Sequence, residues 1–262
     1  MRRHRVVIAA VGLALGLAGC ASLRSTVPDG LLPLDLVDIP AGRFLMGDFF
    51  DQQNDDALPR HERQVAAFRL MRHEVTYAEY DAYAVAFGYP LPPDDNRGRG
   101  NRAVTYVDWE EAQAFCAAYG YRLPTEVEWE YAARSGGRPE RFAGTDDPDS
   151  LGAYARYLGN SSLAQSFPSG TKRPSHWGLY DLSGNVAEWI GAYYAFYPDS
   201  GAAPVYNDLE QSAMRVIRGG HFNNPAHVLH TYWRVATINS NRSVTIGFRC
   251  AADPPRRWWR WW

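Results

Sequence analysis

Three short helices are the most firmly specified parts of this sequence, and they limit the folds it can adopt. A Thr or Asp is followed three residues later by Glu at Thr76, Asp108 and Thr125. This capping-box spacing satisfies backbone N–H groups that the first turn of a helix leaves unpaired. Apolar side chains follow at helical spacing, and Gly88 and Gly120 end the first two segments. The sequence therefore predicts helices over 76–87, 108–119 and 125–134.

The rest of the chain favours short strands and long loops. Gly, Pro, Ser and Asp are spread through 136–175 and polar residues through 223–245, so both stretches are predicted to be irregular. Long loops on a small regular scaffold usually carry function. Strands are expected within 34–46, where a turn separates two of them, and at 65–75, 178–189, 214–218 and 246–251. Together these elements predict a mixed α+β domain.

The composition is that of one compact globular unit. Hydrophobic residues make up 46% and charged residues 21% of 262 residues, which excludes a largely disordered chain. Lys+Arg is 27 and Asp+Glu is 29, so the net charge is −2 and no nucleic-acid partner is expected. Lys172 is the only lysine, which leaves one candidate for a lysine nucleophile.

Residues 1–19 have the pattern of an export signal. Three arginines precede an apolar stretch over 6–17, which is too short to span a bilayer as a helix. The stretch ends in Leu-Ala-Gly-Cys at 17–20, which resembles the lipobox of bacterial lipoproteins. The resemblance implies cleavage before Cys20 and attachment of lipid to that cysteine. A plain secretory signal is the alternative interpretation.

The expected location is therefore the bacterial cell envelope, with the membrane as a partner through the N-terminal lipid. Residues 20–33 would form the lipidated cysteine and its tether. Ala21 stands where an Asp often retains lipoproteins in the inner membrane, which favours the outer membrane.

The cysteine count fits an oxidising compartment. The chain has three cysteines, and if Cys20 carries lipid, Cys116 and Cys250 remain as one pair. We expect a disulfide between them, and two buried reduced cysteines are the alternative.

Four ordered stretches resemble the formylglycine-generating, or sulfatase-modifying factor, superfamily. The resemblance covers most of the chain, predicts a domain over 34–253, and implies a loop-rich variant of the C-type-lectin-like fold. The stretches are IPAGRFLMG at 39–47, YRLPTEVEWEYAAR at 121–134, GLYDLSGNVAEW at 178–189, and RVIRGG at 215–220 with GFRC at 247–250.

The resemblance also implies a calcium site. The family binds calcium at the Gly-Asn-x-x-Glu-Trp segment, which here places the ligands at Asn185, the Val186 carbonyl and Glu188. Hard oxygen ligands beside turn carbonyls suit calcium. A turn satisfied by its own side chains is the alternative.

The expected catalytic residues are missing from this sequence. Oxidases of the family use two cysteines in a Cys-x4-Cys arrangement shortly after the Arg-Gly-Gly, bind copper there, and oxidise a substrate cysteine. The segment 221–234 contains no cysteine. Alignment from Gly220 places Asn224 and Leu229 at the two positions, and alignment from Arg234 places Pro225 and His230 there. Copper(I) chemistry requires thiolates, so this activity is not expected.

The same segment contains His221, His227 and His230. Imidazoles suit iron or copper, so a divergent metal-dependent oxidase acting on a small molecule or peptide is an alternative function. Loop or packing histidines are the simpler interpretation. A Ser-His-Asp triad is not supported, since no nucleophile motif such as Gly-x-Ser-x-Gly occurs.

The favoured hypothesis is a binding protein without oxidase activity. Residues 221–245 are rich in Asn, His, Tyr, Trp and Thr, which make adaptable contacts at low entropic cost. The candidate binding residues are Asn223, Asn224, Tyr232 and Trp233. The partner would be a small ligand or another envelope protein.

The last residues, 254–262, form a tail that alternates Arg with Trp. This composition suits an anionic membrane interface. A frayed appendage is the alternative.

Overall fold

The computed structural model describes residues 29–50, 55–161, 165–197 and 214–255. The predicted signal at 1–19, the lipidation of Cys20, most of the tether and the Arg/Trp segment of the tail lie outside the described residues. Among the described residues, no helix is long and apolar enough to cross a membrane.

The three predicted helices are present, and each begins with the expected capping box. They are α1 (Tyr77–Phe87), α2 (Trp109–Ala118) and α3 (Glu126–Ala133). Gly88 ends α1 in the left-handed conformation at φ 71°, as its position predicts. Local hydrogen bonding alone fixes these boundaries, which is why the sequence predicts them well. Shorter helical turns occur at η1 (Asp55–Ala57), η2 (Pro148–Ser150), α4 (Leu151–Tyr154) and η4 (Ala226–Leu229).

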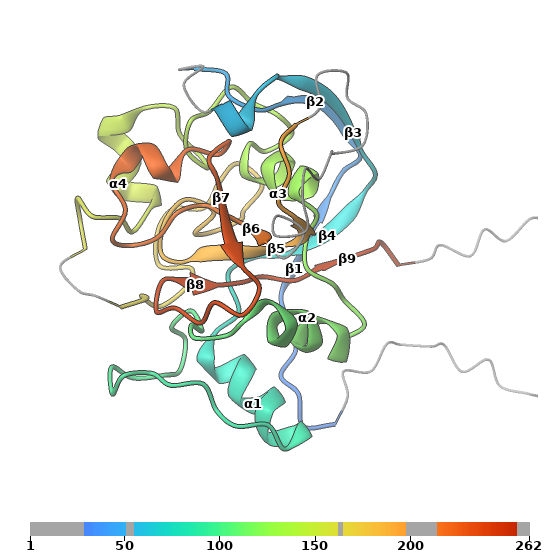
Figure 1. Cartoon of the computed structure of the whole chain (residues 1–262), viewed down its shortest axis with the longest axis vertical. Helices are drawn as coiled ribbons and strands as arrows, with labels where there is room; N and C mark the ends of the chain where they lie inside the picture. Colours follow the sequence, from blue (N-terminus) through green and yellow to red (C-terminus); the bar gives the residue numbers. More distant parts are fainter. Residues whose placement is uncertain (1–28, 51–54, 162–164, 198–213, 256–262) are drawn as a thin grey trace, which may run out of the picture.

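A four-stranded sheet with the order β7-β6-β5-β8 lies at the centre of the domain (Figure 1). Its strands are β5 (Ala187–Tyr193), β6 (Met214–Arg218), β7 (Arg234–Ile238) and β8 (Ile246–Gly247). The strand predicted at 178–189 was placed too early, because Asp181 and Asn185 take positive φ in turns before β5. The segment predicted to be irregular, 223–245, contributes β7.

Two smaller sheets bring distant parts of the chain together. β1 (Leu36–Ile39) pairs with β4 (Phe68–Met71), and β4 pairs with β9 (Ala251–Ala252). β2 (Gly42–Met46) pairs with β3 (His61–Val65). The single strand predicted at 65–75 is therefore two strands in different sheets. The strand–turn–strand expected at 34–46 is confirmed.

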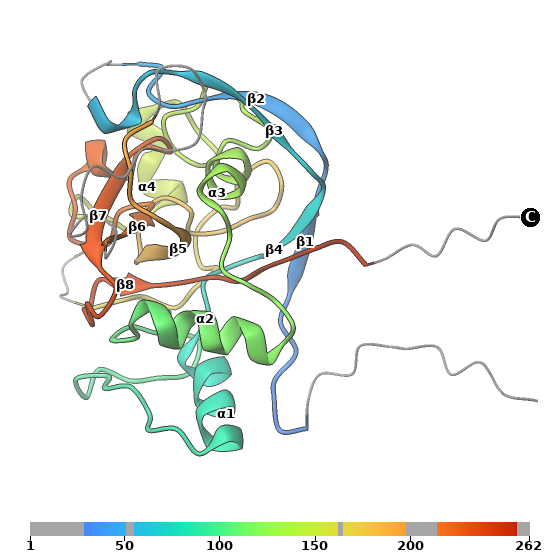
Figure 2. The ribbon, with the colours of Figure 1, turned by 45° about the vertical axis from the view of Figure 1, so that its right-hand side comes forward.

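The helices lie on two sides of the central sheet. Helix α3 packs against β2, β3 and β5, whereas α2 contacts β5 and α1 lies beyond α2, at one end of the molecule (Figures 1 and 2). The predicted disulfide is confirmed: Cys116 on α2 is bonded to Cys250 just before β9. Around it pack the buried rings of Tyr80, Phe115 and Phe248. The final strands are therefore part of the core.

Candidate functional site

A buried carboxylate on α3 joins three of the four motif segments. Glu130 accepts hydrogen bonds at Oε1 from the Gly47 backbone N–H at 2.9 Å and from Arg134 Nη1 at 3.2 Å. Its Oε2 accepts a hydrogen bond from Arg218 Nη2 at 2.6 Å. Glu130 and both arginines are almost completely buried, so loss of one partner would leave an uncompensated charge. This carboxylate fixes β6 and the end of β2 against the helix.

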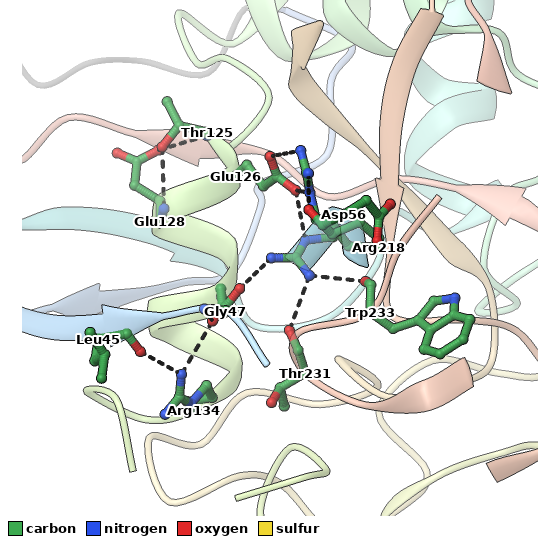
Figure 3. A network of polar contacts seen from close by, with 12 residues as sticks. Leu45, Gly47, Asp56, Thr125, Glu126, Glu128, Arg134, Arg218, Thr231 and Trp233 are labelled. Atoms are coloured by element: carbon green, nitrogen blue, oxygen red, sulfur yellow. Dashed lines mark hydrogen bonds and ion pairs between the residues drawn. The ribbon is translucent and has the colours of Figure 1, made fainter. Parts of the chain in front are cut away.

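Arg218 also holds the backbone that follows the Gly-Gly. Its Nη1 donates to the carbonyls of Thr231 at 3.3 Å and Trp233 at 2.9 Å. Figure 3 shows the guanidinium between α3 and this backbone, with the Trp233 indole directed away from the network. The network thus fixes the backbone of Trp233 and leaves its indole ring outside these contacts.

Glu126 completes this side of the network. It forms ion pairs with Arg218 at 3.3 Å and with Arg234 at 2.6 Å, measured between nitrogen and oxygen. Burial by itself raises the pKa of Glu126, but Arg234 and Arg218 outweigh burial and lower it. The carboxylate is therefore held in its ionised form.

A pocket of about 260 Å³ opens beside Gly219 and Gly220. It lies over β6 and β7, and the loop between β7 and β8 forms its opposite wall. Both glycines take positive φ, at 90° and 66°. A Cβ on Gly220 would lie 3.0 Å from both the Leu229 side chain and the Val228 carbonyl, so only glycine fits this turn without a shift.

The pocket walls combine neutral hydrogen-bonding groups with apolar surface. Asn241 donates to Thr237 Oγ1 at 2.8 Å, and the hydroxyls of Ser243 and Thr245 lie 2.7 Å apart. Among the described residues that line the pocket there is no carboxylate, thiol or lysine, and the guanidinium of Arg218 is bound to α3 behind it. The described lining residues therefore offer hydroxyl, amide and imidazole groups with which to bind a molecule.

The three histidines have separate surroundings. His221 lines the pocket, and its Nδ1 accepts a hydrogen bond from the Asn223 backbone N–H at 3.3 Å. His227 is exposed and lies against the edge of the Trp233 ring. His230 is buried, with its Nδ1 2.6 Å from the Tyr232 hydroxyl. Burial lowers the pKa of His221 to about 4, so this ring is uncharged at neutral pH.

In the described part of the chain the three histidines do not form one cluster of side chains, and iron or copper binding stays a prediction. Within the described ranges, no group of three or more His, Cys, Asp or Glu side chains is arranged to hold a metal ion. The physical reason lies in the short η4 helix and the turn after it, which direct His227 to the surface and His230 into the interior. The structure therefore does not bring His221, His227 and His230 together.

Two of the four candidate binding residues line the pocket. Asn224 and Trp233 do so, and Asn224 also accepts a hydrogen bond from the His221 backbone N–H at 2.9 Å. Asn223 is exposed outside the lining. Tyr232 is buried on the other side of the segment, beside His230 and 6.2 Å from the Phe50 ring. Residues 230–233 form a turn, closed by the Trp233 backbone N–H donating to the His230 carbonyl at 2.9 Å, and this turn separates the buried Tyr232 from the pocket-lining Trp233.

The predicted calcium ligands are close in sequence, but the side-chain oxygens of Asn185 and Glu188 have other partners. Asn185 Oδ1 accepts a hydrogen bond from the Phe167 backbone N–H at 2.8 Å. Both Glu188 oxygens accept hydrogen bonds from Arg249, at 2.7 and 2.8 Å. The Val186 N–H donates to Glu74 at 3.1 Å. These side chains do not form an open set of ligands, and calcium at this segment stays a prediction.

The far wall of the pocket was not predicted. Thr237, Asn241, Ser243 and Thr245 lie in a stretch that the sequence indicates only as irregular and polar. The available signal is the position of this stretch directly before the Gly-Phe-Arg segment, whose strand pairs with β5 and brings the loop back over the sheet.

The fold, and the contacts that Glu130 makes between the motif segments, agree with a comparison to known protein families. Residues 27–254 match the family model described as the sulfatase-modifying factor enzyme 1-like domain, and the chain belongs to this family. The predicted fold, a loop-rich α+β variant of the C-type-lectin-like fold, is confirmed.

Named relatives include both an enzyme and an inactive homologue. The formylglycine-generating enzyme of Streptomyces coelicolor is 29% identical, and the alignment covers 83% of this chain and 88% of the enzyme. The inactive C-alpha-formylglycine-generating enzyme 2 of Mus musculus is 28% identical, with 84% and 86% covered.

Solved structures give the same picture. PvdO from Pseudomonas aeruginosa has a TM-score of 0.71 at 29% identity, covering 84% of this chain and 94% of that chain. Treponema denticola variable protein 1 has a TM-score of 0.70 at 25% identity, covering 84% and 95%.

Proposed function

We propose that this chain is a lipid-anchored protein of the bacterial cell envelope that binds a neutral polar ligand in the pocket beside Gly219 and Gly220. The observation that carries the proposal is the pocket itself. Its walls offer amide, hydroxyl, imidazole and indole groups, and the described lining residues include no thiol. The proposal places binding where the oxidases of the family have their cysteines.

The cysteines of this chain support a function other than thiol oxidation. Cys116 and Cys250 are joined to each other within the core. Of the two residues that align with the oxidase pair from Gly220, Asn224 lines the pocket and Leu229 is buried. Neither side chain binds copper(I) as a thiolate does. One similar protein, from mouse, is itself named inactive.

The chemistry of the walls favours an uncharged ligand. A charged ligand would need a buried partner, and none of the described lining side chains supplies a free opposite charge. His221 is neutral because of its lowered pKa, and with Nδ1 accepting a hydrogen bond its Nε2 carries the proton. The indole of Trp233 adds a flat apolar surface. A ligand that carries hydroxyl and amide groups matches these donors and acceptors.

Binding is tested with oligosaccharides of N-acetylglucosamine, which carry hydroxyl and amide groups in a neutral molecule. Isothermal titration calorimetry would be run on the full chain in detergent, with uncharged peptides as the second probe set. We expect Trp233→Ala to weaken binding at least tenfold. Ile238→Ala, at the far end of β7 from Trp233 and outside the pocket lining, should leave binding unchanged. Equal binding by both variants would mean that the ligand binds outside this pocket.

Oxidase activity and anchoring are tested separately. Oxygen consumption with a cysteine peptide and added copper should equal that of the peptide and copper alone, and turnover would overturn the non-oxidase part of the proposal. Mass spectrometry of the mature N-terminal peptide should show lipid on Cys20. A Cys20→Ser variant should lose the lipid and leave the membrane fraction.

A further inference from the structure

An unusual surface lies at the end of α1. Residues 82–93 contain no charged side chain, and seven consecutive residues within them, 85–91, are exposed. Most of the seven are apolar or aromatic. We name the large exposed side chains of this region, together with Leu32, which lies beside it, the α1-end patch. Its members and their exposed fractions are Leu32 at 42%, Val85 at 74%, Phe87 at 49%, Tyr89 at 52% and Leu91 at 50%.

Exposed apolar side chains are concentrated in the patch and are not spread evenly over the surface. These five make up half of the ten large exposed hydrophobic side chains among the described residues. Single exposed apolar side chains are normal, but a contiguous charge-free group of them marks a surface that contacts something other than water.

The patch is held in a fixed shape. The ring of Tyr83 is buried and lies 5.2 Å from the Phe87 ring and 5.5 Å from the Tyr89 ring, measured between centroids. The Tyr89 backbone N–H donates to the Ala84 carbonyl at 2.8 Å, and Gly88 turns the chain between them. Little ordering entropy would be lost when this surface meets a partner.

The start of the described chain is fixed beside the patch. Leu31 is buried in the same core cluster as Tyr83, and the Tyr119 hydroxyl donates to the Leu32 carbonyl at 3.0 Å. A Cβ on Gly30 would lie 3.4 Å from the Ala86 Cβ. In both ribbon views the segment before β1 runs alongside α1 at the bottom of the molecule (Figures 1 and 2).

Chain length then limits where a membrane anchor can be. Nine residue steps separate Cys20 from Asp29. At full extension they reach about 30 Å. A lipid on Cys20 therefore keeps the α1 end of the domain within about 30 Å of the bilayer surface.

We infer that the α1-end patch is a membrane-contact surface that sits in the headgroup region of the bilayer holding the N-terminal lipid. This inference rests on the proposed lipid anchor. Phe is suited to that region because its ring is apolar, and Tyr because it combines an apolar ring with a polar hydroxyl. The patch side chains carry no charge, and the charged groups that line the hollow beside Tyr89 are the carboxylates Glu110 and Glu111, so added salt should not weaken the contact. Helix α2 lies between α1 and β7 (Figure 1), and the pocket is lined from β6, β7 and the loop after β7, so this inference leaves the pocket on the aqueous side.

The test uses the lipidated full chain with a single engineered thiol. Val85→Cys places an environment-sensitive fluorophore in the patch, and Ile238→Cys places it on β7 as the control. Both positions carry exposed β-branched side chains, and the native pair Cys116 and Cys250 is already bonded. The labelled chains are reconstituted in vesicles of phosphatidylethanolamine and phosphatidylglycerol, with and without spin-labelled lipid.

We expect the Val85 probe to show a several-fold rise in emission, a shift to shorter wavelength, and quenching by spin-labelled lipid that persists in high salt. The Ile238 probe should show none of these. If the N-terminal peptide carries lipid but the Val85 probe remains in water, the membrane-contact inference fails while the anchor stands. If Cys20 carries no lipid, both fail. A change that needs no vesicles and grows with protein concentration would overturn the inference in favour of a second copy of the chain.

Discussion

Two buried ion clusters in this domain have opposite balances of charge. One lies behind the pocket and the other beneath the Gly-Asn-x-x-Glu-Trp segment, and the Trp129 indole links them by donating to Glu188 at 2.9 Å. We name them the cation-rich cluster and the acid-rich cluster. The cation-rich cluster contains Glu126, Glu130, Arg134, Arg218 and Arg234, and the acid-rich cluster contains Glu74, Asp181, Glu188 and Arg249.

The difference shows that two buried clusters in the same domain can shift carboxyl pKa values in opposite directions. In the cation-rich cluster the arginines lower the pKa of Glu126 despite its burial. In the acid-rich cluster burial raises the pKa of Glu74, and the nearby charges of Asp181 and Glu188 raise it further. Burial also raises the pKa of Asp181. In the cation-rich cluster the arginines hold the carboxylates in their ionised form. In the acid-rich cluster the only cation among the named residues is the guanidinium of Arg249.

Replacing that guanidinium should have the largest effect. Arg249→Met would leave three buried carboxyl groups without their cation, and we expect a loss of about 4 kcal/mol in the free energy of unfolding at pH 7. Because burial raises the pKa values of Glu74 and Asp181 in the folded state above those of the unfolded chain, the folded state would hold more protons. Stability relative to the wild type should therefore recover as the pH falls toward 5. Urea unfolding measured across this range tests the sign.

Arg218→Met should cost less and show no such recovery. It leaves two guanidinium groups with two carboxylates, and we expect a loss of about 3 kcal/mol that acid does not reverse. The matched control is Arg242→Met, which removes an exposed ion pair with Asp108 and Glu111 and should cost under about 1 kcal/mol. Equal pH dependence in the Arg218 and Arg249 variants would mean that the two clusters do not differ as described.

The pocket should add a pH effect of the opposite sign. Burial depresses the pKa of His221 in the folded state to about 4, below its value of 6.5 in the unfolded chain. Between these values the unfolded chain binds more protons, so stability is lost as pH falls, by at most about 1.4 kcal/mol per pH unit. His221→Asn should flatten the slope between pH 6.5 and 4. An unchanged slope would show that His221 titrates normally.

Removal of calcium should have the smallest effect on stability, and it tests whether the acid-rich cluster differs from the cation-rich cluster in binding a cation. The calcium prediction implies that a chelator lowers the Tm of the purified chain, whereas an unchanged Tm would mean that the hydrogen bonds from Arg249 already satisfy both Glu188 oxygens. A fall of several degrees, with calcium found by elemental analysis, would show that the acid-rich cluster takes up a cation and would support the calcium prediction.

The sequence predicts local structure here far better than it predicts long-range pairing. Each capping box needs only residues three apart, and all three are confirmed. By contrast, Glu130 and Arg218 are 88 residues apart, and a carboxylate in the first turns of a helix is equally consistent with a solvated surface. The signal that Glu126 and Glu130 face inward was their i,i+4 spacing around Trp129.

The candidate site was predicted in part for the same reason. The motif order located the Gly-Gly turn, and the residue types after it pointed to Asn224 and Trp233. The histidine spacing suggested ligands, but the η4 turn separates the three rings. The opposite wall depends on how β8 returns beside β5 in parallel, a pairing that no local pattern specifies.

The position of the final strands sets the order in which the domain can be completed. β4 is paired on one side by β1, from the beginning of the domain, and on the other by β9, from its end. Phe248 and Cys250 complete the core around α2. A ribosome or an export channel delivers these residues last, so the domain cannot close while most of it is emerging. A chain interrupted before Ile246 would lack β8, β9 and the disulfide together, which makes loss of the last few residues of the core as disabling as loss of its middle.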